Sequence, residues 1–257
     1  MVINKQNIEK KIIFISSYPK SGNTWVRILI STLLNKNNGL FNFKDLKKIL
    51  LFSSLKYFSK FKKIKYQKNG NLDFNFVCDN WINAQKKINE ENNEICFFKT
   101  HSVRGIINGK FFTDESVCLG YVYIVRDPRD IAISLAHHQG ITIDKAIDIM
   151  LFKNDFVTSP DKVNEPVCTW KNHIESWSEF KNVSRLIIKY EDLLNDTKKE
   201  LDQIISFLSD VANINIIKND DLVDNVLNST NFKNLQLIEK KEGFEEAMPN
   251  SKFFREG

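Results

Sequence analysis

Four short apolar runs recur along the chain, and each is followed at once by polar or charged residues. They cover residues 12–18, 95–101, 121–126 and 185–190. Runs of this length that are rich in Ile, Val and Phe are typical of strands buried on both faces of a sheet. Longer stretches with helical character separate the runs. The pattern therefore predicts an α/β fold, in which a central parallel sheet carries helices on both faces.

The stretches between the runs differ in how their apolar residues are spaced. Residues 24–34 have apolar side chains on nearly every face, which is typical of a helix buried against a sheet. Residues 163–182 carry a single apolar stripe, which predicts a helix with one face on the core. Nothing resembles a linker or an internal repeat, so residues 1–257 are expected to form one domain.

The first apolar run leads into a turn with the properties of a phosphate-binding loop. Gly22 lets the backbone approach a ligand closely, and the N–H groups at the start of the next helix favour an anion. Lys20 adds a mobile positive charge. This lysine precedes the glycine, whereas the Walker A pattern G-x-x-x-x-G-K-[ST] places it after the last glycine. The order of residues therefore disfavours an ATP site.

The second and third runs also end in side chains suited to chemistry. Lys99 and His101 close the second run, and Arg126 closes the third. The carboxyl ends of strands in open α/β sheets face the ligand crevice. After Arg126, the sequence predicts Asp127 as a helix N-cap and Pro128 as the first helical residue. The Arg126 guanidinium is then able to meet a phosphate through paired hydrogen bonds.

Charge is unevenly distributed along the chain. The formal net charge is +5, yet residues 41–70 contain nine lysines and one acid, which gives this segment +8 and leaves −3 for the rest. Apolar residues alternate with the lysines, so the segment is amphipathic and compatible with a helix. Two interpretations remain open and can coexist: the lysines lie in water on a helix that covers the core, or they attract an anionic surface or substrate.

Two further features concern the environment of the protein. No apolar run approaches the length of a membrane span, and no secretory apolar region precedes the first strand, so a cytoplasmic location is expected. The four cysteines lack C-x-x-C spacing, which favours buried free thiols over a metal site or a disulfide framework. These cysteines are Cys78, Cys96, Cys118 and Cys168.

The order Tyr-Pro-Lys-Ser-Gly-Asn-Thr-Trp at residues 18–25 resembles the 5′-phosphosulfate loop of the sulfotransferases. These enzymes use 3′-phosphoadenosine 5′-phosphosulfate (PAPS) as sulfuryl donor. The resemblance covers nearly the whole chain and implies the P-loop NTPase-like sulfotransferase fold. It also implies that the loop holds the 5′-phosphate, through Lys20, Ser21, Gly22, Asn23, Thr24 and Trp25.

Other segments resemble the family in the same order. Lys99-Thr100-His101 is similar to the run that carries the family's catalytic histidine, which implies His101 as the base, with Lys20 and Lys99 stabilising charge on the transferred group. Arg126 and Ser134 resemble the family's 3′-phosphate site. Further resemblances imply that Tyr190, Thr230 and Phe232 lie on the adenine side, and that the 3′-phosphate clamp includes Arg255, Glu256 and Gly257.

The clamp resemblance stops short, because the family's clamp continues through a second glycine and a tryptophan that are absent here. Either the sequence is a truncated version of a longer product, or the clamp is abbreviated. The resemblance predicts a PAPS-dependent sulfotransferase that acts on a hydroxyl or amine of an unidentified acceptor, without a metal and without nucleic acid. The alternatives are an ATP-dependent small-molecule kinase on a related fold, which needs Mg²⁺, and a non-catalytic anion or nucleic-acid binder built on residues 41–70.

Overall fold

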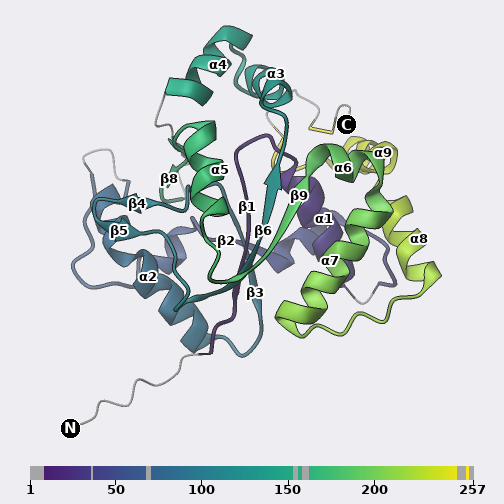
Figure 1. The fold of residues 1–257 in the computed structure, drawn as a ribbon, viewed down its shortest axis with the longest axis horizontal. Helices are drawn as coiled ribbons and strands as arrows, with labels where there is room; N and C mark the ends of the chain where they lie inside the picture. Colours follow the sequence, from purple (N-terminus) through teal and green to yellow (C-terminus); the bar gives the residue numbers. More distant parts are fainter. Residues whose placement is uncertain are drawn as a thin grey trace. The chain divides into compact units, whose positions relative to one another are not determined.

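The largest sheet formed by the described residues has five strands (Figure 1). The computed structural model describes residues 9–35, 37–67, 71–152, 156–157, 162–247 and 253–254. Its main sheet has the order β2-β3-β1-β6-β9. β1 pairs parallel with β3, from Ile12 opposite Cys96 to Ser16 opposite Thr100. The five strands are β1 (Ile12–Ser17), β2 (Ile49–Leu51), β3 (Cys96–Thr100), β6 (Cys118–Val125) and β9 (Ser184–Lys189).

The predicted α/β class with a central parallel sheet is confirmed. The four apolar runs of the sequence correspond to β1, β3, β6 and β9, with ends that differ by at most three residues. Within the main sheet, the strand that the sequence did not predict is β2, because three residues within a lysine-rich segment give no periodic signal. Two small antiparallel hairpins lie outside the main sheet: β4 (Ile106–Ile107) with β5 (Lys110–Phe111), and β7 (Phe156–Val157) with β8 (Glu165–Pro166).

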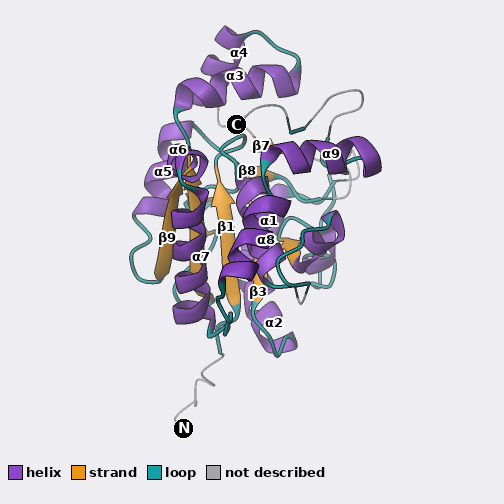
Figure 2. Ribbon diagram, turned by 90° about the vertical axis from the view of Figure 1, so that its right-hand side faces the viewer, coloured by secondary structure: helices purple, strands orange, loops and turns teal. Residues whose placement is uncertain are grey.

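Helices account for most of the remaining described residues (Figure 2). All eleven residues of α1 are buried, as expected from its apolar side chains on every face. The helices are α1 (Asn23–Leu33), α2 (Phe74–Glu91), α3 (Pro128–Gln139), α4 (Ile143–Phe152), α5 (Trp170–Ser178), α6 (Tyr190–Asn195), α7 (Thr197–Ala212), α8 (Asp220–Ser229) and α9 (Phe232–Glu242). Short 3₁₀ turns, η1 (Phe43–Lys48) and η2 (Leu55–Tyr57), complete the elements.

The helix predicted over residues 163–182 is much shorter in the structure. Glu165 and Pro166 form β8, and α5 begins only at Trp170. Proline lacks an N–H group and disfavours helical geometry in the residue before it, so the helix cannot extend back through Pro166. Thr169 caps α5 by accepting a hydrogen bond from the N–H of Asn172. The proline and the threonine together were the sequence signal for this boundary.

The lysine-rich segment is not an α-helix over its described residues, 41–67. It contains η1, β2 and η2, and a reciprocal capping box between Asn42 and Asp45 holds η1. Hydrogen bonding of Ile49–Leu51 into the sheet replaces the helical ladder that the amphipathic pattern suggested. The lysines of this part are exposed, whereas Phe41, Ile49, Phe52 and Phe58 are buried. Lysines in water and apolar side chains in the core are therefore the observed arrangement.

The chain divides into two compact units, each made of three segments. Unit 1 comprises Met1–Tyr18, Leu50–Tyr123 and Asp148–Arg185, and unit 2 comprises Pro19–Ile49, Ile124–Ile147 and Leu186–Gly257. In unit 1 an aromatic core surrounds Phe14, whose ring contacts Phe52, Phe98, Phe112 and Trp177. In unit 2, α1 packs against η1, α7 and α8. The assignment of residues 1–257 to one domain stays a prediction.

The described residues add three observations on environment and metals. None of the helices they form is long and apolar enough to cross a membrane. They contain no cluster of three or more His, Cys, Asp or Glu side chains placed to hold a metal ion. All four cysteines are free thiols, as the sequence predicted, and three of them are buried.

Candidate active site

The turn between β1 and α1 has the backbone shape of an anion-binding loop. Lys20 and Gly22 both adopt left-handed conformations, with φ of 70° and 95°. Gly22 is the N-cap of α1, and its carbonyl accepts hydrogen bonds from the N–H groups of Trp25 and Val26 at 3.0 and 3.3 Å. Gly22 offers no side chain as a cap, and the first turn of α1 contains no acidic residue. The helix dipole and the first N–H groups therefore favour an anion at this end.

Gly22 is required at its position for two independent reasons. Its φ lies in the left-handed region that side chains rarely adopt. In addition, a Cβ atom built on Gly22 would lie 2.4 Å from Cδ2 of Tyr190, well inside van der Waals contact. Tyr190 is buried, at 5% exposure, so its ring has little room to move. The sequence indicated the glycine, but only the fold shows that Tyr190 packs on it.

Arg126 joins this loop from the end of β6. Its Nη1 donates a hydrogen bond to the carbonyl of Lys20 at 3.2 Å, and its guanidinium lies 4.1 Å from the ring centroid of Tyr190. Within the described part of the protein, its buried Nε has no hydrogen-bond partner. A buried N–H donor of this kind costs free energy until an acceptor reaches it. Arg126 therefore has a donor left for an anion beside the loop.

The helix after Arg126 begins as the sequence predicted. Asp127 caps α3 by accepting from the N–H of Arg129, and Pro128 is its first residue. Hydrogen bonds from Arg129 lower the pKa of the Asp127 carboxyl to about 2, so this carboxylate stays ionised. Ser134, the second predicted 3′-phosphate residue, lies further along α3 and is half-buried.

An aromatic cluster covers the start of α1 in unit 2. The Trp25 ring lies 4.8 Å from Phe232 and 6.0 Å from Tyr190, centroid to centroid, both edge-on. Trp25 Nε1 donates to the Thr230 carbonyl at 3.1 Å. The Thr230 hydroxyl donates to the carbonyl of Val226 at 2.7 Å and is buried. The fold thus brings together four residues that the resemblance implied for the adenine side and the loop.

The structure describes some, but not all, of the remaining residues that were predicted to bind PAPS. The Lys20 ammonium lies 5.3 Å from the ring centroid of Phe253. The Ser21 hydroxyl is buried and, among the described residues, lacks a hydrogen-bond partner. Arg255, Glu256 and Gly257, the predicted clamp, lie outside the described residues. All the described donor candidates belong to unit 2, whereas Lys99 and His101 belong to unit 1.

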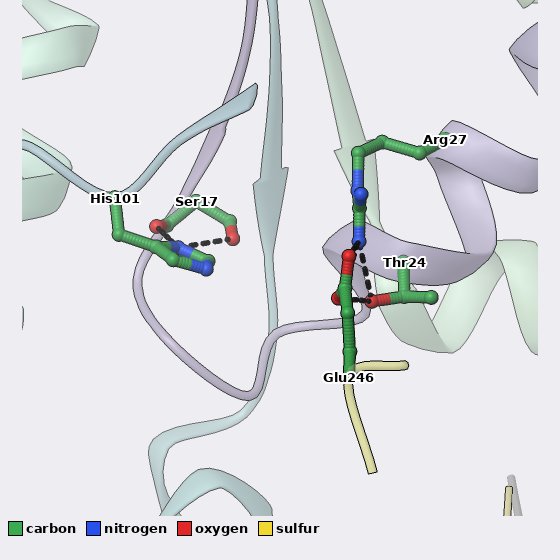
Figure 3. Close-up of polar contacts among 5 residues, drawn as sticks. All are labelled: Ser17, Thr24, Arg27, His101 and Glu246. Carbon is green, nitrogen blue, oxygen red and sulfur yellow. Dashed lines mark hydrogen bonds and ion pairs between the residues drawn. The ribbon is translucent and has the colours of Figure 1, made fainter. Parts of the chain in front are cut away.

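In unit 1, the His101 side chain is anchored on the last residue of β1 (Figure 3). Its Nδ1 lies 2.8 Å from the Ser17 carbonyl oxygen and 3.5 Å from the Ser17 hydroxyl. A carbonyl oxygen only accepts, so Nδ1 carries the proton and the lone pair of the neutral ring is on Nε2. The parallel pairing of β1 with β3 explains the contact, because it places their carboxyl ends side by side. Ser17 directly precedes the residues of the loop in the chain.

The backbone of His101 is held from both sides. Its N–H donates to Oε1 of Glu165 at 2.9 Å, and the same oxygen accepts from the Thr100 hydroxyl at 2.8 Å. Its carbonyl accepts from Nε2 of His173 at 3.0 Å, and Nδ1 of His173 accepts from the Tyr123 hydroxyl at 2.8 Å. The ring and the main chain of His101 therefore have fixed positions. Lys99, two residues earlier on β3, is half-buried and lies on the other face of the strand from Thr100.

Sequence reasoning missed several of these residues. Ser17 acts through its carbonyl, which has no signature in the sequence, and Glu165 is far from His101 along the chain. His173 is completely buried and both of its ring nitrogens are hydrogen-bonded, which indicates a structural role. Arg27, a charged residue within the apolar helix α1, was a signal that could have been used, because a buried charge requires a partner.

The buried His173 makes stability depend on pH. Burial lowers the pKa of His173 to about 4, whereas an unfolded histidine titrates near 6.5. The unfolded chain therefore binds more protons between these values, and the free energy of unfolding should fall by about 3 kcal/mol as the pH drops from 6.5 through 4. Urea unfolding at pH 7.5, 6, 5 and 4.5 measures this slope. The dependence of the unfolding free energy on pH should become weaker in His173→Leu. It should be unchanged in the control His137→Gln, because His137 is exposed. An unchanged pH dependence in His173→Leu would show that His173 is not the source of the effect.

The chain is similar to sulfotransferases in sequence. The family model described as "Sulfotransferase domain" matches residues 10–257. Human sulfotransferase 1E1 is 24% identical over 223 residues, which cover 86% of this chain and 65% of that protein. Rat sulfotransferase 1E1 is 24% identical over 225 residues, covering 87% of this chain and 65% of that protein. The chain thus spans slightly less than two thirds of the length of these relatives.

Solved structures share the fold. Mouse sulfotransferase SULT7A1 complexed with PAP superimposes with a TM-score of 0.53 at 22% identity, over 89% of this chain and 66% of that one. Retinol dehydratase in complex with androsterone and PAP gives a TM-score of 0.59 at 17% identity, over 96% of this chain and 73% of that one. The predicted P-loop-like architecture is confirmed by this likeness.

Proposed function

The chain belongs to the sulfotransferase family, and we propose that it moves a sulfuryl group from PAPS to a hydroxyl or amine of a small acceptor by in-line transfer. The observation that carries the proposal is the cluster in unit 2. There, the loop before α1 has left-handed backbone conformations at Lys20 and Gly22. Arg126 donates a hydrogen bond to this loop, and Tyr190 packs against it. A loop of this kind binds phosphate groups through backbone N–H donors and a nearby guanidinium.

The residues of unit 2 suit a nucleotide with phosphates at both ends of its ribose. Ser21 and Arg126 each have a buried polar atom without a partner in the described part of the chain, and an anion would satisfy both. Lys20 and residues 21–25 would hold the 5′-phosphate, and Arg126 with Ser134 the 3′-phosphate. The adenine would meet the aromatic side chains of Trp25, Tyr190 and Phe232. When bound, PAPS supplies an activated sulfuryl group.

His101 is the proposed base. The hydrogen bond from Nδ1 to the Ser17 carbonyl supports a neutral ring with its lone pair on Nε2, which can take the proton of the acceptor hydroxyl. Glu165 and His173 hold the main chain of this residue in place. Lys20, and secondarily Lys99, would stabilise negative charge on the transferred group and the departing oxygen. One fixed donor of this kind is worth about 3–4 kcal/mol in a transition state.

Two further proposals concern location and surface. The free cysteines support a reducing compartment, and we place the protein in the cytoplasm. The exposed lysines of residues 41–67 support peripheral contact with an anionic surface or an anionic acceptor. Their attraction should weaken as salt is raised, because exposed charges are screened over about 8 Å at physiological ionic strength.

The donor is tested by thermal unfolding in the presence of nucleotides. PAP (3′-phosphoadenosine 5′-phosphate) should stabilise the protein far more than AMP or ATP. Arg126 and Ser134 are proposed to contact its 3′-phosphate, which AMP and ATP lack. At a hundredfold excess over the dissociation constant the gain is about 2.7 kcal/mol. Arg126→Gln should remove most of the preference for PAP over AMP. Equal stabilisation by ATP, dependent on Mg²⁺, would favour a kinase and overturn the proposal.

A further inference from the structure

Arg27 is a buried charge on α1 of unit 2, a helix whose other residues are all uncharged. Its side chain is 2% exposed, and its Nη2 bonds to Oγ1 of Thr24 at 2.9 Å and to both carboxylate oxygens of Glu246 at 2.8 and 2.7 Å (Figure 3). Within the described residues, its Nε has no hydrogen-bond partner. A buried guanidinium is stable only beside a negative charge. Glu246 supplies that charge in this structure.

Glu246 also engages a residue of the loop. It follows α9 in the chain, and its Oε2 accepts a hydrogen bond from the Thr24 hydroxyl at 3.3 Å. Thr24 is the second residue of α1 and one of the residues proposed to hold the 5′-phosphate. A carboxylate from the C-terminal part of the chain therefore lies on the first turn of the helix, where an anion is favoured.

The Thr24 hydroxyl cannot donate a hydrogen bond to Glu246 and to a phosphate at the same time. The Thr24 hydroxyl has one proton, and it points to Glu246. Its oxygen accepts from Arg27. The oxygens of an ionised phosphate ester only accept hydrogen bonds, so a phosphate can use the Thr24 hydroxyl only after Glu246 has released it.

We propose that Thr24 and Arg27 form an anion site that Glu246 occupies, and that a phosphate group of the nucleotide displaces this carboxylate. Arg27 then becomes a further nucleotide-binding residue, and Glu246 is its exchangeable counter-ion. The identity of the nucleotide rests on the proposed function. Since the phosphate brings at least as much negative charge as the carboxylate, the buried guanidinium is not left uncompensated by the exchange.

Neighbouring contacts explain how Glu246 can leave without releasing its whole segment. The N–H groups of Phe253 and Phe254 donate to the Glu239 carboxylate on α9 at 2.7 and 3.1 Å. The rings of Phe244 and Phe253 pack edge-on, with centroids 4.8 Å apart. These contacts hold Phe244, which precedes Glu246, and Phe253 and Phe254, which follow it, independently of Arg27. The exchange therefore requires a local opening of the backbone around Glu246, while the contacts of Phe253 and Phe254 with α9 stay in place.

The test compares Glu246→Gln with Glu245→Gln, which removes the same charge from the exposed residue beside it. PAP binding is measured by titration calorimetry, with pyrophosphate as a second probe. Glu246→Gln should bind PAP about tenfold more tightly than the parent chain, within the 5- to 150-fold range of typical coupling between ligands, and it should melt at a lower temperature without ligand. Glu245→Gln should change neither quantity.

The outcomes separate this inference from the proposed function. If the parent chain fails to bind PAP, the proposed function is wrong, and pyrophosphate binding still tests the exchange. If the parent binds PAP but Glu246→Gln binds it equally or more weakly, Glu246 is no competitor and the inference is overturned. Should the variant fold poorly, hydrogen exchange in the parent chain decides: the N–H groups of residues 244–247 should exchange faster with PAP bound, and slower exchange would contradict displacement.

Discussion

Replacing His101 by alanine is expected to lower kcat by about 10²- to 10⁴-fold and to leave the dissociation constant for PAP nearly unchanged. The imidazole is held with its proton on Nδ1 by the Ser17 carbonyl, so its loss removes the proposed base. The groups proposed to bind the nucleotide, such as Arg126 and Tyr190, make their contacts with one another in unit 2 and do not depend on the imidazole. Steady-state kinetics with a sulfated product assay, together with calorimetric titration of PAP, measure the two quantities separately.

His137→Ala is the matched control, because this histidine is exposed on α3. It should leave both kcat and PAP affinity unchanged. The pH profile of kcat adds a second readout, because it should differ between the parent chain and His101→Ala if the imidazole takes the acceptor proton. If His101→Ala keeps near-normal turnover at neutral pH, the base is another group, and His137 and His138 become the first candidates.

Gly22→Ala is expected to abolish PAP binding at any practical concentration and to destabilise the fold by more than about 2 kcal/mol. The left-handed backbone alone costs about 1–2 kcal/mol for a residue with a side chain. The methyl group would also lie 2.4 Å from the buried Tyr190 ring, so either the loop or the ring must shift. Either shift disturbs the loop, since Arg126 contacts both Tyr190 and the Lys20 carbonyl.

Gly109→Ala separates the two costs. Gly109 has φ of +73°, but a Cβ atom there would meet nothing within 4 Å. The free energy of unfolding of this control should fall only by the cost of the left-handed backbone, and the control should bind PAP like the parent chain. Urea unfolding and calorimetry on both variants give the comparison. The loss of stability in the double variant Gly22→Ala/Tyr190→Ala should be smaller than the sum of the losses in the two single variants, because the clash is counted only when both side chains are present. Equal losses in Gly22→Ala and Gly109→Ala would show that the Tyr190 contact does not constrain the loop.

Local patterns were sufficient for the framework of the protein. Four strands were predictable: β1, β3, β6 and β9. Each is a short run rich in Ile, Val or Phe and bounded by polar residues, which is typical of a buried strand. The cap at Asp127 and Pro128 was predictable because it depends on residues that are adjacent in sequence. Where local signals competed, as at residues 41–67, hydrogen bonding of β2 to a distant strand decided the outcome.

The sequence by itself determined the class of fold, the position of the loop and the residue types at the strand ends, because each is encoded within about ten consecutive residues. Only the tertiary structure decided which partners those residues have. The Ser17 carbonyl that orients His101 is 84 positions away in the chain, and the Glu246 carboxylate that neutralises Arg27 is 219 positions away. Contacts over such separations depend on how strands and helices pack, and a single sequence carries no local signal for them.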